Sequence, residues 1–321
     1  MRGRGQLLTR VAAIDCGTNS IRLLVTDLAD PGTNLPPREV LRRMEIVRLG
    51  AGVDRTGELA PEAIERTGVA LASFAADITD LGAERVRMVA TSATRDARNR
   101  GAFEAMVIEL LGQPAEVITG TEEAALSFLG ATADIAALTE APPPPYLVLD
   151  IGGGSTEFVL GEDSVTASLS VDIGCVRLTE RHLSSDPHAP DEIGAAEADI
   201  RVALAAVAEA VPIRAPISLI GLAGSVTTVA AIALGLSEYD PDAIHHSRVP
   251  VGDMRSTTAG LLTMTRARRA QIPSMHPGRV DVIGAGALIL RVVMDAWAID
   301  SVLVSEHDIL DGIAASMADS S

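Results

Sequence analysis

The sequence Asp150-Ile151-Gly152-Gly153-Gly154-Ser155-Thr156 lies between two apolar runs, and Asp15-Cys16-Gly17-Thr18-Asn19-Ser20 repeats its plan near the start of the chain. Each stretch follows a run typical of a β-strand, turns on glycine and enters another such run. Glycine lets backbone N–H groups approach an anion closely, and the hydroxyls add further donors. The aspartate offers an oxygen ligand to Mg²⁺ or to its water shell. Two such turns predict a duplicated fold that closes around one phosphorylated ligand.

The composition is that of a globular protein. The chain has 321 residues, 47% of them hydrophobic and 21% charged, which is enough for two domains with substantial cores. No apolar run reaches the roughly 18 residues that a membrane span needs. The basic segment Met1–Leu8 lacks the apolar core of a signal peptide. We therefore expect an N-terminal extension, a cytoplasmic location and no membrane partner.

The charge of the chain excludes several mechanisms. The net charge is −17, and all 26 basic residues are Arg, so no Walker-A, Schiff-base or general-base lysine exists. Phosphate must instead be bound by Arg, backbone N–H groups and metal. The acidic surface and the aromatic content of only 2% argue against nucleic acid as a partner. Cys16 and Cys175, far apart in sequence, are expected to be two buried thiols rather than a disulfide.

The hydrophobic pattern divides the chain into two similar parts. Strands are predicted at residues 11–14, 21–28, 39–47 and 86–90, with a helix over 62–78 that starts at Pro61. The stretch 139–145 contains four consecutive prolines and is the clearest linker. Strands predicted at 146–151, 157–160 and 165–171 then restart the pattern. The predicted domains are residues 9–130 and 131–318. A helix follows Thr119-Gly120, with Thr121 as its N-cap and Glu122 and Glu123 favoured in its first turn by the helix dipole.

Three motifs carry a resemblance to a known family. They are Ala13–Ser20, Thr119-Gly120-Thr121-Glu122-Glu123-Ala124, and Asp150–Glu157. Together they resemble the exopolyphosphatase/guanosine pentaphosphate phosphatase family, within the superfamily of actin, hexokinase and the chaperone ATPases. The resemblance covers about residues 10 to 317 and fits the short form, without the helical C-terminal domain of longer relatives. It implies an α/β fold of two actin-like (ribonuclease H-like) domains with a cleft between them.

The resemblance also implies roles for individual residues. Glu123 matches the family's catalytic carboxylate, which positions or deprotonates the attacking water. Asp150 and Glu157 match carboxylates that organise the divalent metal. The positions that match phosphate or substrate contacts are Asn19, Arg95, Gly152, Gly153, Gly154, Ser155, Thr156 and Arg279. The ending Val304–Gly312 lacks the basic residue that many relatives carry there, which leaves the choice of substrate open.

The same residues suit the chemistry of phosphoanhydride hydrolysis, which needs a held water and neutralised phosphoryl oxygens. The leading hypothesis is a Mg²⁺-dependent (or Mn²⁺-dependent) exopolyphosphatase that releases orthophosphate from inorganic polyphosphate, with Glu123 activating water. The closest alternative is a pppGpp 5′-phosphohydrolase of the stringent response. A weaker alternative from another class is an actin-like ATP-binding scaffold or kinase. The sequence is also compatible with a homodimer.

Two further groups receive ordinary interpretations. Arg266-Ala267-Arg268-Arg269 is interpreted as a solvated helix end that could alternatively line a polyphosphate track. The six histidines show no metal-ligand spacing: His245 and His246 are adjacent and the others are scattered. We therefore interpret them as surface or capping residues.

Overall fold

The structure is a computed structural model that describes residues 8–29 and 37–318. Most of the expected N-terminal extension, residues 1–7, lies outside the described residues. The contacts divide the chain into two compact units, one within residues 1–119 and 309–321 and the other formed by residues 120–308. Each unit is built around one mixed sheet. The predicted α/β class is therefore confirmed.

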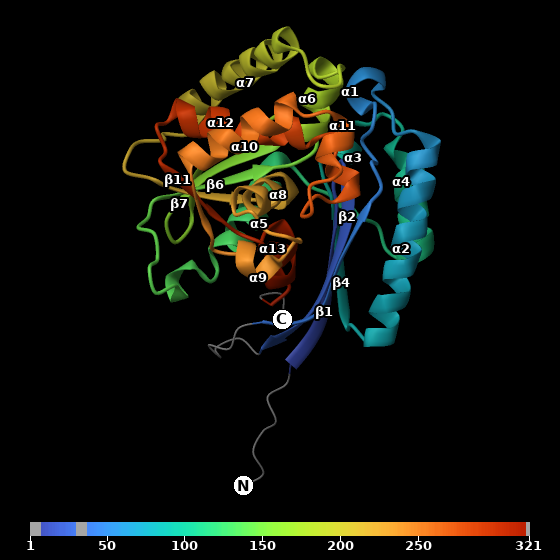
Figure 1. Ribbon diagram of the computed structural model, residues 1–321. Coiled ribbons are helices and arrows are strands. Elements are labelled where there is room, and N and C mark those ends of the chain that lie inside the picture. The colour runs from blue at the N-terminus through green and yellow to red at the C-terminus, as the bar shows by residue number, and fades with distance from the viewer. Residues whose placement is uncertain (1–7, 30–36, 319–321) are drawn as a thin grey trace. The chain divides into compact units, whose positions relative to one another are not determined.

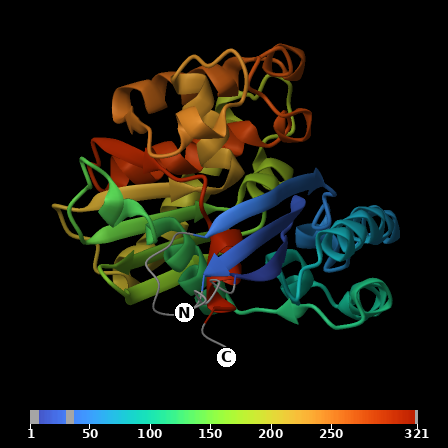
Figure 2. The same ribbon diagram turned by 90° about the horizontal axis from the view of Figure 1, so that it is seen from below.

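The first unit contains a five-stranded sheet of order β3-β2-β1-β4-β5. The strands are β1 (Leu8–Cys16), β2 (Ser20–Ala29), β3 (Arg38–Ile46), β4 (Arg85–Ala90) and β5 (Glu116–Val117). β1 pairs antiparallel with β2 and parallel with β4. Figure 2 shows α2 (Pro61–Leu81) and α4 (Arg100–Leu111) side by side next to this sheet. Alternate residues of β1, among them Ile14, point into the core beneath these helices, while α13 (Ile309–Ser316) packs on β1, β2 and β4.

The second unit repeats this plan. Its sheet has the order β10-β11-β9-β6-β7-β8, so β8-β7-β6-β9-β11 corresponds to β3-β2-β1-β4-β5. Its strands are β6 (Tyr146–Ile151), β7 (Thr156–Gly161), β8 (Val165–Val171), β9 (Ser218–Leu222), β10 (Arg248–Pro250) and β11 (Ser301–Val304). β6 is again antiparallel to its hairpin partner and parallel to the next strand, β9. The duplication predicted from the two turns is thus present in the topology.

The two faces of the second sheet are covered by different helices (Figure 1). Leu147, Leu149 and Phe158 point into a large core with α6 (Cys175–His182), α7 (Pro190–Ala210), α8 (Ala223–Ala233), α10 (Val251–Thr263) and α12 (Ile283–Ala296). Val148 and Val159 point to the other face, where they pack against α5 (Gly120–Thr132) and the 3₁₀ helix η1 (Ile135–Ala137). Because side chains alternate along a strand, Asp150 and Glu157 fall on the α5 face. This alternation builds the candidate site.

The domain boundaries differ from the predicted 9–130 and 131–318. The second unit begins at Gly120, because α5 packs on β6, β7 and β8, and residues from Ile309 onward belong to the first unit, because α13 packs on β1 and β2. The proline-rich stretch 139–145 is therefore a connection inside the second unit. The helix also starts at Gly120 rather than after an N-cap at Thr121, so Thr121 lies in its first turn.

Short elements complete the units. They are α1 (Val53–Thr56), α3 (Ser92–Asp96), α9 (Pro241–Ile244), α11 (Arg266–Arg269) and the 3₁₀ helix η2 (Pro277–Arg279). The interpretation of Arg266–Arg269 as a solvated helix end is wrong for Arg269, which is buried and donates to the carbonyls of Val280, Leu261 and Met264. Its guanidinium closes the loop after α10 rather than lining a polyphosphate track.

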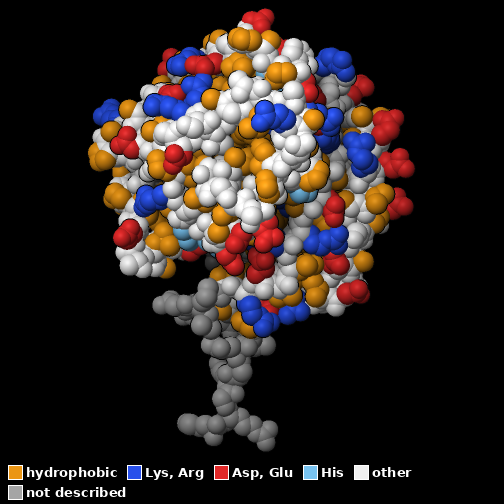
Figure 3. All heavy atoms as spheres, viewed as in Figure 1, with side chains coloured by type: hydrophobic (Ala, Val, Ile, Leu, Met, Phe, Trp, Pro, Cys, Tyr) orange, Lys and Arg blue, Asp and Glu red, His pale blue; other side chains and the backbone are white. Residues whose placement is uncertain are grey.

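The distribution of charged side chains and the state of the two cysteines agree with the expectations from the sequence. Figure 3 shows Arg side chains interspersed with Asp and Glu over the face in view. Cys16 and Cys175 are both buried and free, as predicted. Within residues 8–29 and 37–318, no helix is long and apolar enough to cross a membrane.

Candidate active site

The Gly152–Ser155 turn connects β6 to β7 and is closed by one backbone hydrogen bond. Gly152 N–H donates to the carbonyl of Ser155 over 3.0 Å. The first unit has the same turn between β1 and β2, where Gly17 N–H donates to Ser20 O, also over 3.0 Å. The two motifs found in the sequence are therefore equivalent in structure as well as in topology.

The carbonyl groups of the second turn are held by the start of α6. Cys175 N–H donates to Gly152 O (2.9 Å), and Val176 N–H donates to Gly153 O (2.9 Å). The Arg177 guanidinium donates to Gly154 O over 2.7 Å. Since these bonds occupy the carbonyls, the repulsion between the turn and an approaching anion is reduced. The turn is thereby prepared to present N–H groups to phosphate.

Gly174, just before α6, permits this arrangement. A Cβ atom at this position would lie 2.5 Å from the carbonyl carbon of Gly153 and 2.6 Å from the nitrogen of Gly154. Both atoms belong to backbone and cannot rotate away. Glycine is therefore required by close approach, because α6 could not otherwise reach the turn.

Three carboxylates gather beside the turn. Asp150 on β6 and Glu157 on β7 are direct cross-strand partners on the face covered by α5. Glu123 comes from the first turn of α5, and Glu123, Asp150 and Glu157 are 7%, 6% and 1% exposed. On α5, one turn after Glu123, Ser127 donates to Asp150 Oδ2 over 2.7 Å. On β8, Ser170 donates to Glu157 Oε1 over 2.7 Å. The carboxylates predicted from the resemblance are thus brought together by α5 and the β6–β7 hairpin.

The charges of this cluster perturb one another. Burial raises the pKa of Glu157 well above its ordinary value, and the charges of Glu123 and Asp150 raise it further. Hydrogen bonds from Ser170 and Ser155 oppose this effect but do not cancel it. Buried carboxylates that repel one another need a compensating positive charge. An oxygen-only donor set of this kind suits a hard divalent cation such as Mg²⁺.

In the first unit, the hairpin pair that corresponds to Asp150 and Glu157 consists of one acidic and one basic residue. Asp15 takes the place of Asp150, and Arg22 takes the place of Glu157 in the hairpin register. The Arg22 guanidinium donates to Asp15 Oδ2 over 2.7 and 3.0 Å. The sequence pattern suggested a metal-associated aspartate at both turns, but Asp15 is neutralised by an arginine. An acidic residue thus faces an arginine in the first hairpin, whereas two acidic residues face each other in the second.

The predicted substrate contacts of the first unit lie on its own turn and on α3. Asn19 is half-buried, and its carbonyl accepts from Val47 N–H and Arg48 N–H. Arg95 lies in the last turn of the short helix α3 rather than in a loop, and it donates to Ile118 O over 3.0 Å. These hydrogen bonds hold the Asn19 backbone and the Arg95 side chain in place within the first unit.

Arg279, in the second unit, is attached to the start of α8. Its Nη1 donates to Thr228 Oγ1 over 2.7 Å and to the carbonyl of Gly224. A Cβ atom at position 224 would overlap the Arg279 guanidinium, so this glycine leaves the space that the side chain occupies. Burial raises the pKa of the Cys175 thiol, and the nearby charge of Arg279 partly offsets the rise. Arg279 therefore lies on the α6 side of the glycine turn.

The hydroxyls of the turn have structural partners. Thr156 is fully buried and donates to Ile173 O over 2.7 Å, while Ser155 bonds to Glu157. Ser127, Ser170 and Gly174, which position the carboxylates and the turn, were not predicted. Serine four residues after Glu123 on one helix face was the only sequence signal available for any of them.

The raised pKa of Glu157 predicts how the stability of the metal-free protein depends on pH. The folded chain retains a proton that the unfolded chain releases near 4.5, so this stabilising contribution is present below pH 4.5 and is lost as the pH rises through the folded pKa. Glu157→Gln should therefore stabilise the metal-free protein at pH 8 by roughly 1–3 kcal/mol and by less at pH 5. Urea unfolding in EDTA at both pH values measures this difference.

Glu162→Gln is the control, because Glu162 is exposed at the next hairpin turn. A Glu157→Gln protein that is less stable than the wild type at pH 8 would contradict the assignment of electrostatic strain to this cluster.

Comparisons with known proteins place these features in context. Residues 29–321 match the model of the Ppx/GppA phosphatase family. Exopolyphosphatase 2 of Mycobacterium tuberculosis is 51% identical over 320 residues, which cover 97% of this chain and 99% of that protein. The crystal structure of an exopolyphosphatase-like protein is 42% identical with a TM-score of 0.90, covering 97% of this chain and 99% of that one. The Ppx/GppA enzyme of Aquifex aeolicus is 30% identical with a TM-score of 0.78, covering 97% and 100%.

Proposed function

Because the chain belongs to the Ppx/GppA phosphatase family and is therefore a phosphate-releasing hydrolase, we propose that it is an exopolyphosphatase. It hydrolyses the terminal phosphoanhydride of inorganic polyphosphate and releases orthophosphate. The observation that supports this most is the buried set Glu123, Asp150 and Glu157 beside a glycine turn, in a chain 51% identical to an exopolyphosphatase. The cytoplasm as its location and a homodimer as its assembly are part of the same proposal.

Asp150 and Glu157 would hold Mg²⁺ or Mn²⁺. The donor set fits, because these buried carboxylates lie opposite one another in the hairpin, and burial together with the charges of Glu123 and Asp150 raises the pKa of Glu157. A bound divalent cation would neutralise phosphoryl oxygens and stabilise the leaving phosphate. Ser127 and Ser170 orient the two carboxylates by donating to them.

The protein's own donors bind and orient the substrate. The backbone of Gly152, Gly153, Gly154, Ser155 and Thr156 receives the terminal phosphate, and α6 holds the turn in place. Arg279 binds phosphoryl oxygens of the chain, since a guanidinium makes paired hydrogen bonds to phosphate. Asn19 and Arg95, in the first unit, are proposed as phosphate-binding residues.

Glu123 acts on water. A carboxylate base must be ionised near neutral pH and must lie within reach of the water that it orients. Glu123 lies close enough to Glu157 for its charge to raise the pKa of that residue, so it belongs to the same carboxylate cluster. Glu123 is accordingly proposed to hold the attacking water and to accept its proton.

The closest alternative is hydrolysis of the 5′-terminal phosphate of pppGpp. The same carboxylates and turn would serve it, because both reactions break a terminal phosphoanhydride bond. The test is a phosphate-release assay on short polyphosphate, long polyphosphate and pppGpp, each with Mg²⁺, with Mn²⁺ and with EDTA. Metal-dependent turnover with kcat/KM highest on polyphosphate is expected. Preference for pppGpp would replace this proposal with the alternative, and nucleotide binding without hydrolysis would favour the scaffold or kinase.

Arg279→Ala is expected to raise KM for polyphosphate about 10-fold or more with a smaller change in kcat, because one charged contact to the substrate is lost. The increase in KM should be larger at low salt, because the attraction between Arg279 and phosphate is less screened there. Steady-state kinetics at two salt concentrations measure both effects.

The control is Arg255→Ala, which removes an equal charge from an exposed pair with Asp295. Gly224→Ala should reproduce the KM effect of Arg279→Ala, because a methyl group at position 224 displaces the guanidinium. A change confined to kcat would show that Arg279 acts in the chemical step instead.

A further inference from the structure

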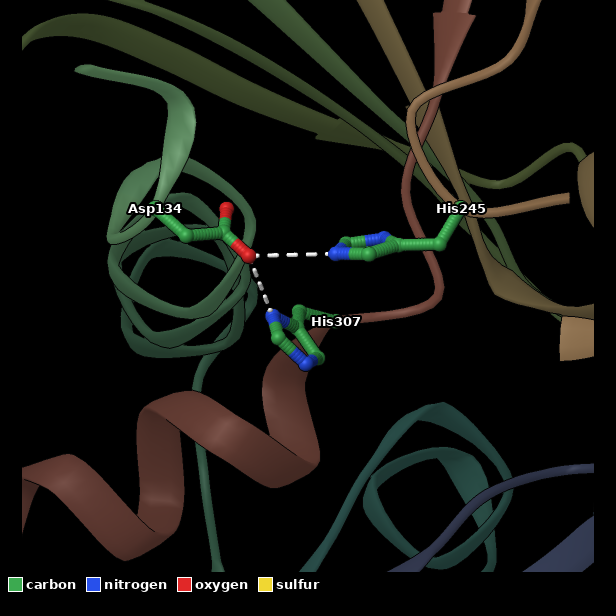
Figure 4. Close-up of side chains that lie close together, drawn as sticks. All are labelled: Asp134, His245 and His307. Atoms are coloured by element: carbon green, nitrogen blue, oxygen red, sulfur yellow. Dashed lines mark hydrogen bonds and ion pairs between the residues drawn. The ribbon is translucent and has the colours of Figure 1, made fainter. Parts of the chain in front are cut away.

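One polar cluster lies apart from the carboxylates and the glycine turn. Figure 4 shows the imidazoles of His245 and His307 directed at the same carboxylate oxygen of Asp134. His245 Nε2 lies 3.1 Å and His307 Nδ1 2.9 Å from Asp134 Oδ2, and the three ligand atoms all lie within 4.8 Å of one another. The three residues come from separate segments: the turn between α5 and η1, the turn after α9, and the segment that follows β11.

The backbone of this cluster is fixed before any ligand arrives. His245 N–H donates to Pro241 O over 2.8 Å, and His246 N–H donates to Val304 O over 2.7 Å. His246 Nε2 lies 3.3 Å from the other oxygen of Asp134. Burial opposes ionisation of Asp134, but hydrogen bonds from His245 and His307 outweigh it and hold the pKa of this carboxyl below its usual range. An ionised carboxylate and two imidazoles are therefore held together, with a third imidazole behind them.

We propose that Asp134, His245 and His307 form a binding site for a borderline divalent transition-metal ion, Zn²⁺ foremost. Two imidazole nitrogens and one carboxylate oxygen are a ligand set that Zn²⁺ uses, with water as the fourth ligand. Ligands of a tetrahedral Zn²⁺ ion, at roughly 2.0–2.1 Å, are about 3.3 Å apart. Both nitrogens already lie near this distance from Asp134 Oδ2, at 3.1 and 2.9 Å. His246 supports the carboxylate from its other oxygen, as outer partners of metal ligands do.

One existing hydrogen bond must change when the ion binds. Glu306 N–H donates to His245 Nδ1 over 3.1 Å, so in the free protein the neutral ring carries its proton on Nε2 and donates it to Asp134. A metal at Nε2 transfers the ring proton to Nδ1, and the Glu306 N–H must then turn to another partner. The affinity is reduced by this exchange, and we expect a dissociation constant in the micromolar range.

The site is distinct from the proposed catalytic cation site. Asp134 lies eleven residues after Glu123 along and beyond α5, which corresponds to roughly 15 Å of helix. Its nitrogen ligands disfavour Mg²⁺, which prefers oxygen. Saturating Mg²⁺ can therefore occupy the proposed carboxylate site while transition metal is titrated into the Asp134–His245–His307 site. If no transition metal binds there, the proposed hydrolysis is unaffected.

The experiment is a Co²⁺ titration of the metal-stripped full chain in saturating Mg²⁺, followed by visible ligand-field absorption. We expect one Co²⁺ per chain, displaced by Zn²⁺, and a shift of the Glu306 amide resonance when Zn²⁺ binds. His307→Gln and His245→Gln should each weaken binding by more than about tenfold. His182→Gln should bind like the wild type, because His182 forms a comparable pair with Asp199 (2.9 Å) outside the cluster.

Two results would overturn the proposal. One is a wild-type protein that binds no Co²⁺ or Zn²⁺ in saturating Mg²⁺. The other is Co²⁺ binding that is unchanged in both His245→Gln and His307→Gln, or that is weakened as much by His182→Gln as by these two variants. Circular dichroism of the metal-free variants establishes that they fold. If either cluster variant fails to fold, the wild-type stoichiometry and the Glu306 resonance decide the question.

Discussion

Replacing Glu123 by Gln is expected to lower kcat for phosphate release by about 10²–10⁴-fold while KM changes little. The amide retains the size of the side chain but cannot accept a proton from water. Glu123 is buried and close enough to Glu157 to raise its pKa, so it belongs to the reacting cluster rather than to the helix surface. Single-turnover phosphate release, together with equilibrium binding of polyphosphate, separates the two effects.

The neighbouring Glu122 provides the matched control. It is exposed in the same first turn of α5, so Glu122→Gln makes the same change in charge and in helix-dipole interaction. We expect this variant to retain nearly full activity. Substantial turnover by Glu123→Gln, or an equal loss in Glu122→Gln, would remove Glu123 from the mechanism.

Gly174→Ala is expected to have the second-largest effect, a loss of roughly 10²-fold in kcat/KM. The added methyl group would overlap backbone atoms of Gly153 and Gly154, so either the turn or α6 has to move. That movement would disturb the bonds from Cys175 and Val176 to the turn carbonyls. We also expect a destabilisation of about 1–3 kcal/mol from overpacking, measurable by urea unfolding.

The control is Gly194→Ala, on the exposed face of α7, where nothing lies within 4 Å of the added Cβ. This variant should be slightly more stable than the wild type, because alanine favours a helix. Activity should be compared on folded protein at a temperature below both transitions. Wild-type kcat/KM in folded Gly174→Ala would contradict the requirement for this close approach.

The local parts of the site could be predicted from the sequence because local physics determines them. Alternating apolar residues and a glycine turn predict the β6–β7 hairpin, and the hairpin register then places Asp150 opposite Glu157. The acidic start of a helix predicted that Glu122 and Glu123 lie in a first turn. Periodicity alone did not distinguish the buried Glu123 from the exposed Glu122. The family resemblance did.

The remaining features depend on contacts between distant segments, which no local pattern encodes. Gly174 is required only because α6 approaches a turn that lies twenty residues earlier in the chain. His245 and His307 are scattered in sequence, and they meet Asp134 only because β9, β11 and α5 pack in one unit. The histidines are interpreted from the sequence as surface or capping residues; His245 does cap α9, but it also meets His307 at Asp134, which the sequence did not predict. The boundary at Gly120 was missed for the same reason, since α5 belongs to the sheet that follows it.

The exchange of Arg22 for Glu157 at equivalent hairpin positions has a consequence for how the protein responds to its ionic surroundings. In one repeat the aspartate is paired with an arginine as soon as the chain folds, whereas in the other the proposed divalent cation would supply the positive charge. Depletion of free divalent ions would therefore loosen one copy of the turn and leave its twin unchanged. The twin serves as an internal reference within the same molecule, and hydrogen exchange at Gly17 and Gly152 would report the difference.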